Sequence, residues 1–148
     1  MLAESWAIHA GWLRERPGDY SASSRRKLMS GAFLSAGDYV SAQQRRSALI
    51  GAVDDVFRDV DALLCASAMD PACRIDDAEA VARTYPRQAR NPFNLTGHPA
   101  LAMMGGLSRA GLPLPVQLVG RSHDEVTLLR VAAAFERATA WHQRRAPI

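Results

Sequence analysis

The sequence predicts an α/β fold in which helices cover a β-sheet. Two apolar runs, residues 100–104 and 116–119, are too short for helices and are bounded by turn-forming residues. Helical periodicity instead extends over residues 39–60 and over a C-terminal segment that ends near Ala138. Because the two apolar runs lack polar alternation, we expect the sheet to be covered on both faces.

Two helices are expected before the long one. Residues 3–16 place apolar side chains on one side at helical spacing, and the Pro17-Gly18 pair ends this helix. His9 lies near its apolar face without a second metal ligand three or four residues away, so it is interpreted as a packed residue. Residues 21–33 form the second predicted helix.

The third predicted helix, residues 39–60, is the longest periodic segment, with Asp38 as its expected N-cap. Its apolar residues recur at intervals of three, four or seven: Ala42, Leu49, Val53, Val56 and Val60. We interpret it as a scaffold helix. A strand over residues 61–65 and a short helix or loop over residues 76–85 follow.

The central stretch, residues 90–121, is expected to form a turn, a strand, a second turn, a second strand and a final turn. The turn before residue 100 contains Asn and Pro residues, and Gly111 provides the next. The two strands are predicted to pair antiparallel and to be largely buried. Ser108 is assigned to the connecting loop, and Pro115, which lacks an N–H, to an edge or strand-start position.

The last helix is expected to begin with a capping box. Ser122 is the predicted N-cap, with Glu125 reaching back to the free N–H groups of the first turn. Trp141 is expected to pack the tail onto the body, and residues 142–148 to form a polar end.

Composition excludes several classes of protein. The chain has 148 residues, 48% of them hydrophobic, which is typical of a globular protein and not of a disordered one. No apolar run is long enough to span a membrane and no signal-peptide pattern is visible, so the expected location is cytoplasmic. The net charge is +3, but arginines alternate with acidic residues, which argues against a nucleic-acid-binding stripe. Cys65 and Cys73 match no zinc spacing.

Several phrases carry a resemblance to a known family. They are NPFNLTGHPAL at residues 91–101, then GLP, then QLVGR at residues 117–121, followed by an acidic pair and a helix; SAGDYVSAQQRR at residues 35–46 adds to them. Together they resemble the C-terminal part of the amidase signature family, serine hydrolases of amide bonds. The resemblance implies that residues 1–148 are a fragment of the amidase signature fold, a mixed β-sheet flanked by helices, without the family's N-terminal catalytic half.

The same resemblance implies which residues have roles. Family members use a lysine and two serines in a Gly/Ser-rich stretch, which this chain does not match, so no catalytic residue is assigned. Ser23, Ser24 and Lys27 are interpreted as a solvated helix face. Arg26, Asn94 and His98 are the candidate substrate-binding residues. No metal and no cofactor is expected.

Arg87 and Arg90 stand where glutamine-using branches of the family carry an acidic residue, so the resemblance disfavours those branches. The expected function is that of a scaffold and substrate-wall segment of an amidase that is inactive alone. Its expected partner is a complementary N-terminal amidase fragment or a second copy of the chain, with neither nucleic acid nor membrane involved. Two alternatives remain: a stand-alone interaction module or pseudoenzyme, and a basic nucleic-acid binder.

Overall fold

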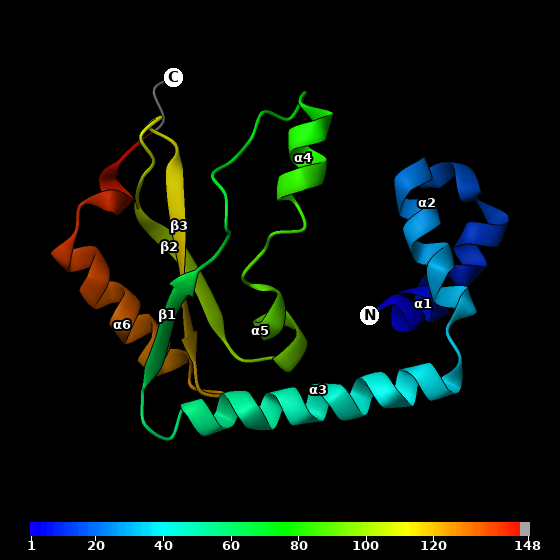
Figure 1. Ribbon diagram of the computed structural model, residues 1–148, viewed down its shortest axis with the longest axis horizontal. Coiled ribbons are helices and arrows are strands. Elements are labelled where there is room, and N and C mark those ends of the chain that lie inside the picture. The colour runs from blue at the N-terminus through cyan, green and yellow to red at the C-terminus, as the bar shows by residue number, and fades with distance from the viewer. Residues whose placement is uncertain (146–148) are drawn as a thin grey trace. The chain divides into compact units, whose positions relative to one another are not determined.

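The computed structural model describes residues 1–145, so part of the expected polar end lies outside the described residues. The chain forms two compact units, Met1–Ser47 and Ala48–Ile148, and their boundary falls within the long helix α3 (Ala36–Val56). Figure 1 shows the elements of both units in chain order.

The first unit is helical. It contains α1 (Leu2–Glu15), a short 3-10 helix η1 (Pro17–Asp19), α2 (Ala22–Met29) and a second 3-10 helix η2 (Ser30–Phe33), followed by the start of α3. Pro17 begins η1 where α1 ends, as expected. Gly31 of η2 lies against α1, because a Cβ at this position would be 2.8 Å from both the Leu2 carbonyl carbon and the Trp6 Cβ.

Helix α3 is capped by Ser35, and the expectation that Asp38 is the N-cap was wrong. The Ser35 hydroxyl oxygen accepts a hydrogen bond from the Asp38 N–H at 3.0 Å, and the Asp38 carboxylate accepts one from the Ser35 N–H at 3.0 Å. This reciprocal pair is a capping box in which Asp38 takes the place of the usual Glu. Hydrogen bonds from Ser35 hold the pKa of the Asp38 carboxyl below its usual range.

The second unit is built on three strands, β1 (Ala62–Ala66), β2 (Ala100–Leu107) and β3 (Pro113–Gly120). Their order is β1-β3-β2, and both pairs are antiparallel. Leu118 of β3 stands opposite Leu64 of β1 and Leu101 of β2. The α/β class and the antiparallel pairing of the two central runs are therefore confirmed. Residues 117–120 of β3 are buried, whereas β2 is mostly half-buried.

The loop between β2 and β3 is closed by Ser108. Its N–H donates to the Leu112 carbonyl at 2.8 Å, and its hydroxyl oxygen accepts from the Leu112 N–H at 3.1 Å. Gly111 has φ of 77°, which glycine tolerates without strain. Pro115 lies at a bulge opposite Met104, two residues into the central strand, where its missing N–H does not break a regular ladder.

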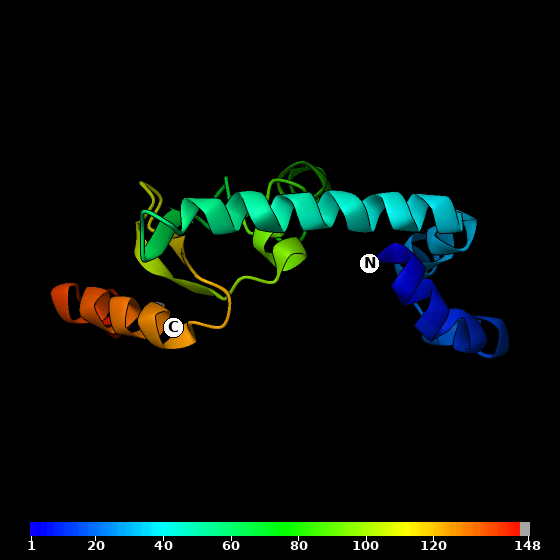
Figure 2. The ribbon, with the colours of Figure 1, turned by 90° about the horizontal axis from the view of Figure 1, so that it is seen from below.

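One long helix, α6 (Glu125–Ala138), packs on one face of this sheet (Figures 1 and 2). Leu128 and Ala132 from α6 meet Leu118, with Leu101 and Met103 packed around them. A 3-10 turn, η3 (Trp141–Gln143), follows and returns the chain to β2.

The segment between β1 and β2 contains two short helices, α4 (Ala78–Thr84) and α5 (Asn91–Thr96). A turn was expected where α5 lies. Pro92 stands in the first turn of α5, where its missing N–H costs nothing, and Gly97, with φ of 83°, ends the helix in the left-handed conformation. The same residues that suggest turns thus also begin and end a short helix.

The cap of α6 differs from the predicted one. Asp124, not Ser122, is the N-cap, and its carboxylate accepts a hydrogen bond from the Thr127 N–H at 3.1 Å. His123 has φ of 63°, and the chain therefore enters the helix two residues later than the capping-box pattern implied. Hydrogen bonds from Thr127 hold the pKa of the Asp124 carboxyl below its usual range.

Replacing Asp124 by alanine should therefore lower the thermal midpoint of the second unit by about 2–4 °C, whereas Ser122→Ala, the matched control, should leave it unchanged. Because the folded-state pKa of Asp124 is depressed, this difference should be present above about pH 4 and fade as the pH falls through the folded-state value. Thermal melts at several pH values provide the measurement. A larger fall in the thermal midpoint for Ser122→Ala than for Asp124→Ala would mean that Ser122 is the N-cap, as the capping-box pattern predicted.

Candidate functional site

The three candidate substrate-binding residues have different environments. Arg26 lies on α2 in the first unit and is exposed. Asn94 lies on α5 in the second unit, and its exposed side chain has no hydrogen-bond partner among residues 1–145. His98, just before β2, has a side chain with 0% exposure. The structure thus brings Asn94 and His98 into one unit.

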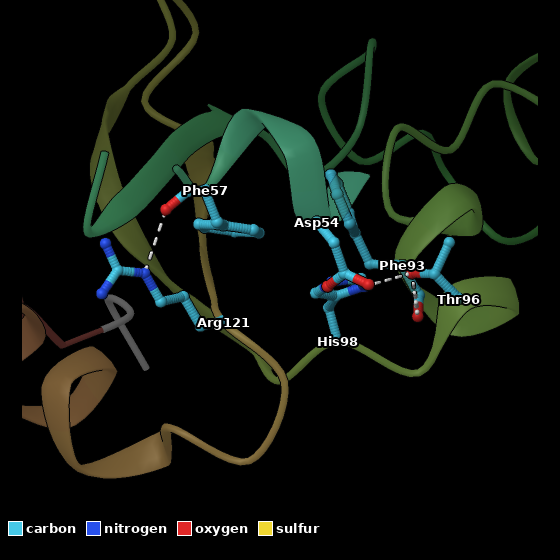
Figure 3. Close-up of polar contacts among 6 residues, drawn as sticks. All are labelled: Asp54, Phe57, Phe93, Thr96, His98 and Arg121. Carbon is cyan, nitrogen blue, oxygen red and sulfur yellow. Dashed lines mark hydrogen bonds and ion pairs between the residues drawn. The ribbon is translucent and has the colours of Figure 1, made fainter. Parts of the chain in front are cut away.

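His98 uses both ring nitrogens within the chain (Figure 3). Nδ1 lies 2.9 Å from the Thr96 hydroxyl, and Nε2 lies 3.1 Å from Oδ1 of Asp54, near the end of α3. Since an ionised carboxylate only accepts, Nε2 carries the hydrogen, and Nδ1 of a neutral ring then accepts from Thr96. The ring also stacks on Phe57, with centroids 5.6 Å apart. His98 therefore fastens the turn before β2 to the end of α3.

Arg121, at the end of β3, fastens the same end of α3 from another side. Its Nε donates to the Phe57 carbonyl at 3.1 Å and its Nη2 to the Val60 carbonyl at 3.2 Å, as part of Figure 3 shows. Nη2 also lies 3.1 Å from the Asp61 carboxylate. A guanidinium suits carbonyl groups beyond a helix C-terminus, which carries partial negative charge. The HP and GR positions of the two motifs thus converge on the end of one helix.

The partners of these two residues were not among those expected from the sequence to have a role. Neither Asp54 nor Phe57 was expected on the apolar face of the third helix. The structure ends α3 at Val56 and buries Phe57, whereas Val56 and Val60 are exposed. Val60 lies beyond the end of the helix, and Val56 is exposed although it belongs to the last turn, so the predicted apolar face does not reach this end of α3. An aromatic residue at the predicted end of the helix was the available signal.

A second polar cluster borders a groove of about 480 Å³ between α4, the loop after β1 and the start of β3. Arg87 Nη1 pairs with Asp70 Oδ1 at 3.2 Å, and the Arg87 carbonyl accepts from the Met69 N–H at 3.1 Å. The other oxygen of Asp70 and Oε1 of Gln88 are buried without a hydrogen-bond partner among the described residues. An unpaired buried acceptor costs about 1–3 kcal/mol. Both residues line the groove, so a hydrogen-bond donor that enters it would remove this cost.

The exposed serines near the start of α2 do not suggest a functional site. The hydroxyls of Ser23 and Ser24 bond to Ser21, which caps α2, on an exposed surface. Within residues 1–145, no group of three or more His, Cys, Asp or Glu side chains could hold a metal ion. In the same residues, no helix is long and apolar enough to cross a membrane.

Comparison with known proteins decides the family, because the sequence profile of the Amidase family matches residues 12–129. The chain belongs to the amidase family. An amidase from Pseudomonas putida is 37% identical over 153 residues, which cover 97% of this chain and 32% of that protein. A glutamyl-tRNA(Gln) amidotransferase subunit from Granulibacter bethesdensis is 39% identical over 140 residues, covering 88% and 28%. The chain therefore spans about a third of the length of these relatives.

Solved structures agree with this family assignment. An amidase crystal structure superposes with a TM-score of 0.79 at 27% identity, covering 93% of this chain and 33% of that one. A bacterial aryl acylamidase of the amidase signature family superposes with a TM-score of 0.76 at 20% identity, which supports the fold alone. The fold of this chain is thus that of about a third of an amidase.

Proposed function

We propose that this chain is the C-terminal scaffold and substrate-wall segment of an amidase, a hydrolase of amide C–N bonds. The observation that carries the proposal is the family match over residues 12–129 in a chain about a third as long as its relatives. Within this proposal, His98 and Arg121 act as positioning residues, since the side chains of both form hydrogen bonds within the chain itself.

Arg26 in the first unit and Asn94 in the second are each proposed as a substrate contact, because the polar groups of both are exposed. The unpaired oxygens of Asp70 and Gln88 add acceptors for an N–H donor in the groove beside α4. The role of His98 as a direct substrate contact stays a prediction, and its full burial favours an indirect one. Arg87 is held by Asp70, so its charge is partly compensated where it stands.

Acyl transfer from an amide needs a nucleophile, a base and an oxyanion site within hydrogen-bond reach of one another. The exposed serine cluster on α2 offers no such trio. The Ser108 hydroxyl oxygen accepts a hydrogen bond within the hairpin loop between β2 and β3. We therefore propose that the 148 residues do not hydrolyse amides by themselves. We also propose that hydrolysis requires the rest of an amidase domain, either in the same polypeptide or in a separate one.

A chimeric enzyme tests the function. When this chain replaces the matched region of the Pseudomonas putida amidase, we expect hydrolysis of simple amides to persist, whereas the 148 residues alone should show no turnover. The matched control places Ser108→Ala, Ser23→Ala and Lys27→Ala in the chimera, where none should change the rate. Turnover by the chain alone that any of these three substitutions abolishes would contradict the proposal. A folded chimera without activity would remove the substrate-wall role.

A further inference from the structure

The groove between α4, the loop after β1 and the start of β3 has largely apolar walls. It has a volume of about 480 Å³ and lies within the second unit. Val81 of α4 and Tyr85, which follows that helix, line one side, and Pro113 and Pro115 of β3 line another. Neither proline carries an N–H, so β3 offers no backbone donor at these two positions. Such walls suit a small ligand with an apolar body.

Two acceptor oxygens at this groove lack a hydrogen-bond partner. They are Oδ2 of Asp70 and Oε1 of Gln88, which are buried and unpaired within residues 1–145. Arg87 holds Asp70 by its other oxygen, Oδ1, at 3.2 Å. Because the terminal torsions of Asp and Gln side chains are soft, each residue can turn its oxygen toward a donor that enters the groove. The groove is therefore suited to a ligand that donates hydrogen bonds.

The charges around the groove favour an uncharged donor over an acid. An ionised Asp70 only accepts hydrogen bonds, so a carboxylate would meet a like charge, whereas an amide N–H would meet a charged acceptor. The ion pair with Arg87 compensates the charge of Asp70, which reduces the gain from a cationic ligand. Arg90 also lines the groove and attracts an acid, but it is exposed, so water and salt screen this attraction.

We propose that this groove recognises a carboxamide on an apolar body and discriminates against the corresponding carboxylic acid. The amide N–H groups donate to Asp70 and Gln88, and the apolar body lies against Val81 and the two prolines. The inference rests on the proposed function, because it names the kind of substrate that the substrate wall admits. It adds that recognition of the amide resides within these 148 residues.

Titration of the 148-residue chain, followed by nuclear magnetic resonance, tests this recognition without hydrolysis. The probes are phenylacetamide and phenylacetate, which share one apolar body and differ in the group that would face Asp70. We expect phenylacetamide to bind at least about fivefold more tightly, with shift changes at the groove residues Val81 and Thr84. Asp70→Asn should remove this preference, because asparagine keeps the shape, loses the charge and adds an N–H₂ donor.

A second variant and two comparisons complete the test. Gln88→Met, which removes an acceptor at similar side-chain length, should weaken the binding of phenylacetamide and not that of phenylacetate. Arg90→Gln should widen the preference, because it removes an attraction for the acid. Glu79→Gln is the matched control, at an exposed position of α4 outside the groove lining, and should bind both probes as the parent does. Equal or tighter binding of phenylacetate by the parent, or a preference that survives both Asp70→Asn and Gln88→Met, would overturn the proposal.

The chimeric enzyme separates this inference from the proposed function. In an active chimera, Asp70→Asn should raise KM for phenylacetamide more than it lowers kcat, because the contact contributes to binding. A chimera that hydrolyses amides, together with a 148-residue chain that binds neither probe, would overturn the inference and leave the proposed function in place. A chain that prefers phenylacetamide, together with a folded but inactive chimera, would support the inference and count against the proposed function.

Discussion

His98→Ala should destabilise the second unit by about 2–4 kcal/mol, although His98 carries no assigned chemistry. The substitution removes a fully buried ring that stacks on Phe57, and it leaves the buried Thr96 hydroxyl with only the longer hydrogen bond to the Phe93 carbonyl at 3.5 Å in place of the contact at 2.9 Å. It also releases the turn before β2 from α3. Equilibrium unfolding in denaturant, followed by circular dichroism, provides the measurement.

The size of the effect should depend on which partner is removed. Asp54 is 52% exposed and can be hydrated after His98→Ala, so most of the cost comes from the buried side of the pair. Asp54→Ala should cost less, and a double-mutant cycle between the two should give a coupling energy of about 0.5–3 kcal/mol. His142→Ala, at an exposed histidine of η3, is the matched control and should change nothing. A loss below about 1 kcal/mol for His98→Ala would contradict the anchoring role.

Sequence patterns predicted the sheet well because its signals are local. The runs around Leu101 and Leu118 are continuous and apolar, and a loop with Gly111 separates them, so antiparallel pairing was the economical solution. The strand around Leu64 followed from the same reasoning. Its position beside β3, on the edge away from β2, could not be read from the sequence, because strand order depends on contacts across more than fifty residues.

Helix boundaries were less predictable than helix existence. Ser35 and Asp124 cap α3 and α6, whereas the patterns favoured Asp38 and Ser122. In both cases several residues that can cap stand within a few positions of one another, and the backbone path into the helix selects among them. The positive φ of His123 is part of such a path, and composition does not predict it.

The motifs of the candidate site could be located from the sequence, whereas the roles of their residues could not. The resemblance located the stretches around His98 and Arg121, yet it suggested a substrate contact for His98 where the geometry shows a buried anchor. The anchor exists only because Asp54 and Phe57, more than forty residues earlier, lie at the end of α3. Such a pairing is a property of the fold, so one sequence without its three-dimensional arrangement does not reveal it.

Gly31→Ala should strongly destabilise the first unit, by about 2–3 kcal/mol or more. An added Cβ would meet the Leu2 carbonyl oxygen at less than contact distance, and would lie 2.8 Å from the Leu2 carbonyl carbon. These are backbone atoms of α1, so no side-chain rotation relieves the clash and the helix itself must move away from η2. A unit of 47 residues has few other contacts to compensate for that displacement.

Gly11→Ala is the matched control, and it should act in the opposite direction. Gly11 lies on α1 with nothing within 4 Å of an added Cβ, so alanine there should stabilise the helix by about 0.5–1 kcal/mol. Denaturant curves followed by tryptophan fluorescence in a Trp141→Phe background report on the first unit, because Trp6 and Trp12 lie in that unit and Trp141 lies in the second. Equal stability of Gly31→Ala and the parent would mean that α1 does not approach η2 as closely as the structure places it.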